Sequence, residues 1–427
     1  MGRTARDKRP HLPPVQRIEL NDQHVSRRLI LTAALLLLGV GLLVYSFLQF
    51  LEPQSEWVTI TADSGGGPSS AGDFTLLYNP GGGDASPSAE RKAVTTLYTG
   101  LARRAFQLFH ADQPFEGVVN VYDLNRRPNE AVEVDPGLYA AFQTVADSGS
   151  RALYLGPVYS RYFGVFTCQD DVELADFDPR LSEAVAAEYR ELCAWANDPD
   201  AIGLELLGEN KVCLRVSEEY LAYAEREGIE DFIDFSWMAN AFITDFIADG
   251  LIAQGYTHGA LTSYDGFCRN LDSGGTDYTL PLYSRQGDTV YAAAELHYTG
   301  PRAFVTLRDY PMSERDASRF YTLKNGERRT PYLDPADGLC RNALPELVCY
   351  SASRGCGEML LAMLPVYVAE GFDAGALDAL KGQGIESIRW EGFTLRCTDS
   401  EAVFENFYSQ DGVAFSAAGD DGKLQNS

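Results

Sequence analysis

The stretch IDFSWMANAFITDF, residues 233–246, decides the fold because it joins a turn to an amphipathic helix. The helix is expected over 236–254, with Gly255 ending it. A junction of this kind directs backbone N–H groups toward a ligand. Such sites usually have glycines for close approach and a lysine or glutamate at the ligand, but here Trp237 lies inside the turn and Asn240 holds the candidate position. The stretch therefore predicts a ligand site that is intact, modified or lost.

The sequence on both sides of this stretch mixes helix and strand patterns. Apolar residues at helical spacing predict helices after Ala89, after the N-caps Asp135 and Ser217, and over 179–197. Strand patterns include FTLLY (74–78), GALTSYDGF (259–267), YTLPLYS, TVYAAAELHY, AFVTL, SIRWEG and FTLRC, with a hairpin signal at KNGERR. We expect the helix that begins at Cys356 to reach Leu364, where Pro365 interrupts it. This order predicts an α+β domain with mostly antiparallel strands.

An uncharged apolar run near the N-terminus predicts a membrane anchor. The run covers 29–51, and at ~1.5 Å per residue it is long enough to cross a bilayer. Residues 1–28 carry seven Lys/Arg against three Asp/Glu, so the positive-inside rule places them in the cytoplasm and the rest of the chain outside. A cleaved signal peptide is the alternative. We expect a single-pass protein of the cell membrane whose main domain is extracytoplasmic.

Composition limits the partners. The net charge of −26 argues against nucleic acid and against anionic lipid surfaces. The eight cysteines lie beyond the apolar run, where disulfides are permitted, and without a CxxC pair a zinc site is not expected. The predicted segments are a cytoplasmic tail (1–28), a transmembrane helix (29–51), a flexible spacer (52–73), the α+β domain (74–408) and a polar C-terminal tail (409–427). Disorder is expected for about the last 15 residues.

Five stretches in one order resemble a known family. They are DLN (123–125) with the helix that follows it, LGPV (155–158), the long segment that starts at 233, TPYLDPADG (330–338) and VCYSASRGCGEMLLAML (348–364). Together they resemble the FAD:protein FMN transferases, the ApbE-like flavin transferases, over residues ~74–405. The resemblance implies an ApbE-like ectodomain that binds FAD with Mg²⁺. It also implies transfer of the FMN half of FAD to a threonine hydroxyl of an acceptor protein, with release of AMP.

The resemblance also assigns residues. Asp234 matches the family's aspartate near the flavin, and Asn240 stands where the family usually has Lys or Glu. Asp334 belongs to the family's Asp-Pro turn, in which Pro331 replaces a histidine. The resemblance thus implies cofactor binding by Asp234, Asn240 and Asp334, metal binding by Glu358, and no identifiable catalytic residue.

The metal ligands are depleted relative to the family pattern. The threonine one turn after Glu358 is replaced by Ala362, and Asp265-Gly266 replaces a Gly-Gly pair. Because Mg²⁺ dehydrates reluctantly and requires several oxygen ligands, we expect flavin transfer to be weak or absent. The two hypotheses are therefore an FMN transferase, intact or weakened, and an inactive module that binds flavin or a protein partner.

Each assigned residue also has a purely structural interpretation. Asp234 could cap a helix start, Asn240 could be an ordinary first-turn polar residue, and Asp334 could simply form a turn. Glu358 could be a solvated helix residue, and Trp237 could belong to the core. Convergence of Asp234, Asn240, Asp334 and Glu358 on one cleft would favour the functional interpretation.

Overall fold

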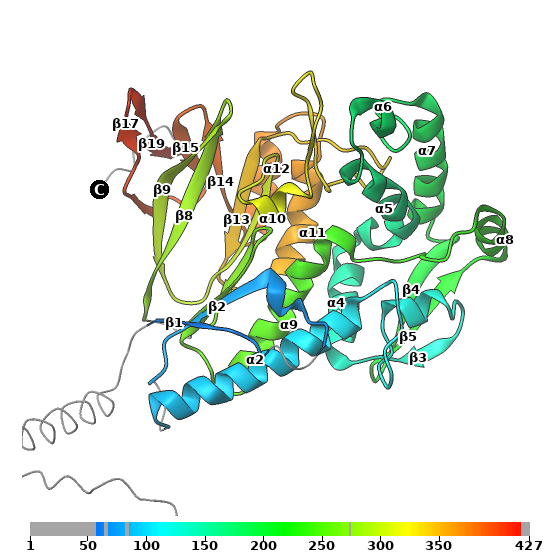
Figure 1. Ribbon diagram of the computed structural model, residues 1–427, viewed down its shortest axis with the longest axis horizontal. Coiled ribbons are helices and arrows are strands. Elements are labelled where there is room, and N and C mark those ends of the chain that lie inside the picture. Colours follow the sequence, from blue (N-terminus) through cyan, green and yellow to red (C-terminus); the bar gives the residue numbers. More distant parts are fainter. Residues whose placement is uncertain (1–56, 64–66, 82–84, 273–274, 420–427) are drawn as a thin grey trace, which may run out of the picture. The chain divides into compact units, whose positions relative to one another are not determined.

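The structure is a computed structural model that describes residues 57–63, 67–81, 85–272 and 275–419. These residues lie in one compact unit, Ser55–Ser427 (Figure 1). The expected cytoplasmic tail (1–28) and transmembrane helix (29–51) fall outside the described residues. Within the described part of the chain, no helix combines the length and apolar character that crossing a membrane requires.

A sheet of nine described strands organises the unit. Every neighbouring pair is antiparallel except the last, β15 with β19, which is parallel. In spatial order the strands are β1 (Val58–Ile60), β2 (Phe74–Tyr78), β6 (Gly259–Ser263), β7 (Phe267–Asn270), β10 (Ala303–Arg308), β13 (Glu346–Ser351), β14 (Glu386–Glu391), β15 (Thr394–Cys397) and β19 (Ser416–Gly419). The predicted α+β class with mostly antiparallel strands is confirmed.

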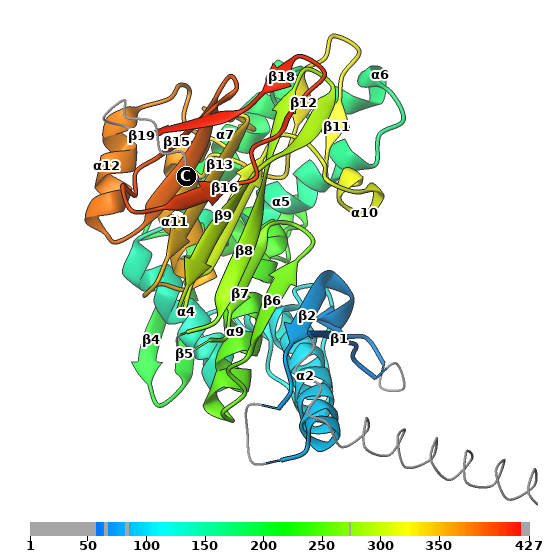
Figure 2. The ribbon, with the colours of Figure 1, turned by 90° about the vertical axis from the view of Figure 1, so that its left-hand side faces the viewer.

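Helices cover one face of this sheet, and a hairpin covers the other (Figures 1 and 2). The helices are α2 (Pro87–Phe109), α4 (Pro136–Ser148), α9 (Ala239–Ala253), α11 (Cys356–Tyr367) and α12 (Ala374–Gly382). The hairpin strands β8 (Asp277–Gln286) and β9 (Thr289–Thr299) pair with β16 (Val403–Glu405) in a three-stranded sheet. Leu282 and Leu296 of the hairpin pack with Phe304 and Val348 of the main sheet, so both faces bury apolar side chains.

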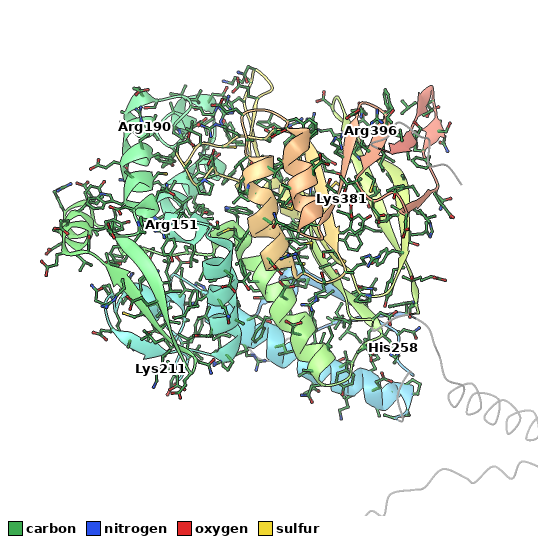
Figure 3. All side chains as sticks on the ribbon, turned by 180° about the vertical axis from the view of Figure 1, so that it is seen from behind. Arg151, Arg190, Lys211, His258, Lys381 and Arg396 are labelled. Atoms are coloured by element: carbon green, nitrogen blue, oxygen red, sulfur yellow. The ribbon has the colours of Figure 1, made fainter. Side chains whose placement is uncertain are left out.

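A second group of elements lies at the other end of the unit. This group contains a three-stranded sheet with the order β3 (Ala131–Glu133), β5 (Lys211–Val216) and β4 (Ile202–Gly208). Helices connect and flank its strands. These helices are α3 (Val121–Asn125), η3 (Ala152–Leu155), α5 (Gly156–Tyr162), η4 (Phe163–Phe166), α6 (Asp171–Leu174), α7 (Glu183–Asn197) and α8 (Glu218–Glu227). Figure 3 shows Arg190 and Lys211 in this group, far from Lys381 and Arg396 beside the main sheet.

Several local predictions are confirmed. The Asp135 side chain accepts a hydrogen bond from the N–H of Gly137, with Pro136 at the first position of α4. Ser217 caps α8 in the same way through the N–H of Tyr220. The expected helix over 236–254 is present as the one-turn helix η5 (Ser236–Met238) followed by α9, and Gly255 adopts a φ of +83° after it. The caps and turn residues therefore fixed these boundaries correctly.

Three predictions at segment ends need correction. Pro365 does not interrupt α11, which continues to Tyr367 because the N–H of Val368 still reaches the carbonyl of Leu364. Part of the predicted flexible spacer (52–73) is ordered, since β1 pairs with β2 and a short helix, η2 (Ser70–Asp73), follows. In the predicted C-terminal tail (409–427), β17 (Ser409–Gln410) and β18 (Val413–Ala414) form a hairpin and β19 extends the main sheet.

The permitted disulfides are not formed. All eight cysteines lie in the described part of the chain, all are free, and all but Cys168 are buried. Burial raises the pKa of thiols such as Cys193 and Cys349, so these side chains pack as small apolar groups.

Candidate functional site

The turn that precedes α9 is closed by its own side chain. The Asp234 carboxylate accepts a hydrogen bond of 2.7 Å from the N–H of Ser236. Ser236 has a φ of +43°, in the left-handed region where a residue with a side chain is strained. Trp237 is 8% exposed and its ring meets Tyr332 edge-on at 5.0 Å between centroids. Trp237 therefore contributes to the core, and the N–H of Ser236 is already engaged by Asp234.

A cavity of about 380 Å³ lies beside this turn, and we call it the polar cavity. Asp234 and Asn240 both line it, so the structure brings these two predicted residues together. The acidic and basic side chains around it are Asp73, His110, Asp112, Asp234, Asp265 and Arg319. Aromatic side chains of Phe106 and Phe109 on α2 line it as well. A concave site with apolar walls and a few converging polar groups is the usual form of a small-molecule site.

Asp265 is the centre of the polar contacts in this cavity. Asp265 is 3% exposed, and its Oδ2 accepts a hydrogen bond of 3.0 Å from the Asn240 amide. The same oxygen lies 2.7 Å from the guanidinium of Arg319, whose side chain is 15% exposed. The other oxygen, Oδ1, is buried and has no hydrogen-bond partner among the described residues. A buried carboxylate oxygen without a partner is costly, so a bound molecule with an N–H or O–H group would stabilise it.

Burial also perturbs the acids around the cavity. Desolvation raises the pKa of Asp234 to about 7, and the nearby carboxylates of Asp112 and Asp231 act in the same direction. The pKa of Asp73 is raised by burial even though Arg315 pairs with it. The side chain of Asp112 is 83% exposed. The charge of the cavity at neutral pH therefore depends on the protonation of Asp234.

Asp334 lies outside the polar cavity and forms a turn. Its side chain accepts a hydrogen bond of 2.9 Å from the N–H of Ala336 and pairs with Arg341 at 2.6 Å. Its carbonyl accepts from the N–H of Gly338, which has a φ of +72°. These contacts agree with the interpretation that Asp334 forms a turn. Asp334 does not line the polar cavity with Asp234 and Asn240.

Glu358 also lies elsewhere. It projects from the first turn of α11 with 43% of its side chain exposed and forms an ion pair with Arg354. It lines a different cavity of about 420 Å³ together with Asp245, Asp249 and Arg269. Asp245 accepts hydrogen bonds from the N–H groups of Cys356 and Gly357 and therefore holds the start of α11. The four predicted residues consequently do not form one site.

The residues around Glu358 do not fit a bound Mg²⁺. The carboxylates of this cavity are engaged by Arg354, by Arg269 and by the backbone of α11. Among the described residues no group of three His, Cys, Asp or Glu side chains could hold a metal ion. Mg²⁺ requires near-octahedral oxygen coordination, and these arginine-paired oxygens do not offer it.

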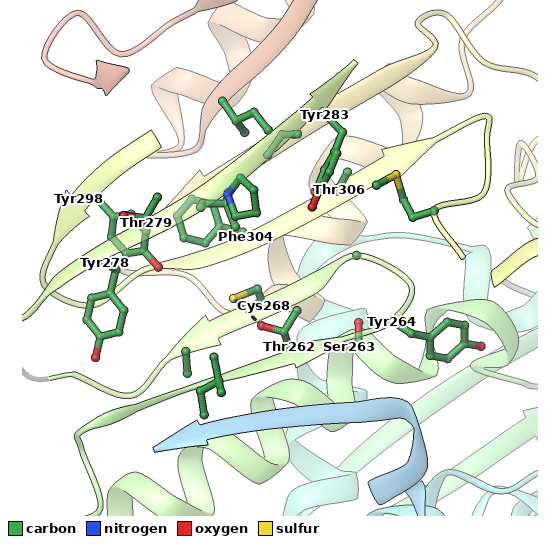
Figure 4. A pocket seen from close by; sticks show the side chains of 18 of the residues that line it. Thr262, Ser263, Tyr264, Cys268, Tyr278, Thr279, Tyr283, Tyr298, Phe304 and Thr306 are labelled. Atoms are coloured by element: carbon green, nitrogen blue, oxygen red, sulfur yellow. Dashed lines mark hydrogen bonds between the residues drawn. The ribbon is translucent and has the colours of Figure 1, made fainter. Parts of the chain in front are cut away.

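A larger cavity of about 630 Å³ lies between the β8–β9 hairpin and the main sheet, and we call it the hairpin cavity. Figure 4 shows Tyr278 and Tyr298 at one end and Tyr264 at the other, with Thr262 donating a 3.3 Å hydrogen bond to the Cys268 sulfur. None of the four predicted residues lines it. We place the candidate site in the smaller polar cavity because Asp234, Asn240 and the unpartnered Asp265 oxygen meet there.

Sequence reasoning did not identify Arg319, the arginine that lines the polar cavity. It follows the short helix α10 (Glu314–Ala317), far along the chain from Asp265, and only tertiary folding brings the two together. Burial opposes its charge, but the Asp265 carboxylate beside it raises the pKa of Arg319. The replacement of a Gly-Gly pair by Asp265-Gly266 was the one sequence signal that a buried cation would be needed here.

Comparison with known proteins agrees with this architecture. No protein-family model matches the sequence, and no curated protein matches it. Among solved structures, the ApbE protein from Thermotoga maritima matches with a TM-score of 0.53 at 14% identity, over 82% of this chain and 97% of that chain. A histidine-to-glycine mutant of the flavin transferase ApbE from Vibrio cholerae matches with a TM-score of 0.52 at 15% identity, over 84% and 98%.

The chain has an ApbE-like fold. The fold implied by the five stretches is thus supported by structures that the chain covers almost completely. At 14–15% identity the likeness concerns the fold alone. Within this ApbE-like fold, residues of segment 233–246 meet Tyr264 and Asp265 at the polar cavity.

Proposed function

We propose that this chain binds a flavin in the polar cavity and does not transfer it. The observation that carries the proposal is the convergence of Asp234, Asn240 and Asp265 on one cavity. These residues lie in the segments that resemble the flavin-binding parts of the ApbE family. The aromatic rings of Phe106 and Phe109 offer apolar surface for a flat ring system, and the Asp265 oxygen offers an acceptor for its N–H group.

The absence of transfer follows from how the acids are used. Transfer would require a cation to neutralise the diphosphate of FAD while a hydroxyl attacks it. Glu358 pairs with Arg354 away from the polar cavity, and Asn240 is neutral and donates to Asp265. FAD and Mg²⁺ were the cofactors implied by the family resemblance. The residues of the polar cavity fit the flavin, whereas those around Glu358 do not fit Mg²⁺.

Binding and AMP release together test this function. The purified full-length protein is titrated into riboflavin, FMN and FAD, and quenching of flavin fluorescence reports binding. FAD, Mg²⁺ and a threonine-containing acceptor peptide are then added, and AMP and fluorescent peptide are measured. Flavin binding without AMP is the expected result, and binding of none of the three flavins would contradict it.

The second candidate is the active FAD:protein FMN transferase. The observation that favours it is the likeness to the Vibrio cholerae protein, whose name is flavin transferase. Its partner would be a protein that presents an acceptor threonine. Stoichiometric AMP release with a flavin-labelled peptide in the same assay would establish this candidate and overturn the first.

We further propose that residues 29–51 anchor the protein in the cell membrane with the ApbE-like domain outside the cytoplasm. The support is the uncharged run and the basic residues before it in the sequence. Protease added to intact cells should digest the domain, whereas a protected domain in intact cells that is digested only after lysis would contradict this orientation.

A further inference from the structure

We propose that the polar cavity selects riboflavin, the flavin without phosphate, against FMN and FAD. This inference rests on the proposed flavin binding and adds to it the chemical class of ligand. It comes from the balance of acceptors and cations around the cavity and from a buried carboxylate oxygen there that has no partner among the described residues.

The cavity offers four carboxylates, and the basic groups that line it, Arg319 and the His110 imidazole, each already lie beside one of them. Asp73, Asp112, Asp234 and Asp265 line it, and among the described residues Arg319 is the only Lys or Arg that does so. The Arg319 guanidinium is already 2.7 Å from Asp265, and Arg315, which approaches from outside, pairs with Asp73. A phosphate would therefore meet net negative charge at short range in a partly desolvated site, where repulsion is stronger than in water.

The unpartnered oxygen requires a donor, which a phosphate at neutral pH does not supply. Asp265 Oδ1 is buried without a partner among the described residues, while the Asn240 amide and the Arg319 guanidinium both contact the neighbouring Oδ2. The amide and the guanidinium each carry further N–H groups. The pyrimidine edge of a flavin presents one N–H between two carbonyl oxygens. Its N–H is the donor that Asp265 Oδ1 lacks, and its carbonyl oxygens are acceptors for such further N–H groups, so we assign the ring end of the molecule to this corner.

The size and the outer wall of the cavity agree with this assignment. The space of about 380 Å³ lies at the lower end of the usual range for small-ligand sites. FAD would add a diphosphate and an adenosine, which would have to lie outside this space. The exposed Asp112 could accept hydrogen bonds from the ribityl hydroxyls, which are donors, whereas it would repel the phosphate of FMN.

Competitive affinities of the three flavins test the selection. The full-length protein is titrated with riboflavin, FMN and FAD at pH 7.5 in about 50 mM salt. We expect the Kd of riboflavin to be at least about tenfold below those of FMN and FAD, and the ratio to shrink at about 500 mM salt because screening weakens the repulsion. Equal or tighter binding of FMN or FAD would overturn the selection and leave flavin binding intact. No binding of any flavin would instead remove the proposed function.

A pair of matched variants separates local repulsion from the overall negative charge of the protein. Asp112→Asn removes one exposed carboxylate at the cavity, and we expect the affinity of FMN relative to that of riboflavin to rise about threefold. Asp200→Asn removes an exposed carboxylate outside the cavity and should change neither affinity. If both variants improve FMN binding equally, the cavity does not discriminate and the proposal is wrong.

Discussion

The two cavities share one turn and differ in what that turn offers them. Between β6 and β7, Tyr264 lines both cavities, Asp265 lines only the polar cavity, and Gly266 lines only the hairpin cavity. Gly266 has a φ of +110°, and a Cβ there would approach the carbonyl oxygen of Thr306 to 2.5 Å. Three consecutive residues thus place a carboxylate on one side and bare backbone on the other.

The difference shows how a binding site can be told from packing. In the hairpin cavity the buried charges at the end are paired, since Arg308 lies 2.5 Å from Asp316 and Glu346 accepts a hydrogen bond from the Tyr310 hydroxyl. In the polar cavity one carboxylate oxygen of Asp265 remains without a partner. The hairpin cavity also has a buried atom without a partner, the Tyr278 hydroxyl. An unpaired carboxylate oxygen is more costly than an unpaired hydroxyl, so this oxygen, and not the volume, is our reason for assigning the ligand to the polar cavity.

The largest expected effect comes from removing Asp265. Asp265→Ala leaves the Arg319 guanidinium buried without its partner, and we expect a loss of about 3–5 kcal/mol in the free energy of unfolding. Thr262→Val on the hairpin-cavity side removes an exposed hydroxyl at similar volume and should cost less than about 1 kcal/mol. Urea unfolding of both variants measures the contrast.

A second substitution identifies the cause of that loss. Adding Arg319→Met to Asp265→Ala removes the unpaired cation, so the double variant should regain at least half of the lost stability. If the double variant is no more stable than Asp265→Ala alone, the ion pair is not what Asp265 contributes.

Stability should fall as pH rises from about 4 to about 7. Burial raises the pKa of Asp234 and of Glu346 to about 7, so in this window the native state holds protons that the unfolded chain has lost. Asp234→Asn should remove about 2 kcal/mol of this pH-dependent loss in the free energy of unfolding. This value is smaller than the rise in the pKa of Asp234 implies, because the residue is only half-buried. Thermal unfolding between pH 4 and 8 measures it.

Riboflavin should alter the pH dependence at one cavity only. Asp234 lines the polar cavity, whereas Glu346 lines the hairpin cavity. Saturating riboflavin should therefore change the pH dependence of stability in the wild type and in Glu346→Gln, and change it less in Asp234→Asn. A ligand effect that is lost in Glu346→Gln and kept in Asp234→Asn would place the ligand in the hairpin cavity instead.

Sequence patterns predicted the parts of this site that are local. Asp234 precedes the one-turn helix η5, and Asn240 lies at the start of α9, which follows η5 directly. Predicting the helix that follows Asp234 was therefore enough to bring the two residues together. The caps at Asp135 and Ser217 were likewise readable because each acts within three residues. These contacts depend on short-range geometry, which residue identity largely determines.

The remaining parts depend on contacts that leave no local pattern. Arg319 and Asp265 are far apart in the sequence and meet only in the tertiary structure. Strand β19 joins β15 in parallel after a polar segment that has the composition of a tail. The family resemblance grouped Asp334 and Glu358 with the flavin residues, but arginines at 341 and 354 engage both elsewhere. Those arginines lie seven residues after and four residues before their partners, so a search for local pairing could have found them.

The smallest expected effect concerns Glu358 and extends the comparison to the third cavity. Its ion pair with Arg354 is solvent-exposed and spans one helical turn, so Glu358→Gln should change the free energy of unfolding by less than about 1 kcal/mol. Millimolar Mg²⁺ should leave the melting temperature of both the wild type and the variant unchanged, because the oxygens around Glu358 are paired with arginines and backbone N–H groups. Differential scanning fluorimetry with Mg²⁺, and with Ca²⁺ as a second oxygen-seeking cation, measures this.

A rise in melting temperature with Mg²⁺ that disappears in Glu358→Gln would mean that Arg354 is displaced and that the ApbE-like metal position still works. Flavin transfer would then regain its physical basis, and the polar cavity would no longer have to act without a cation.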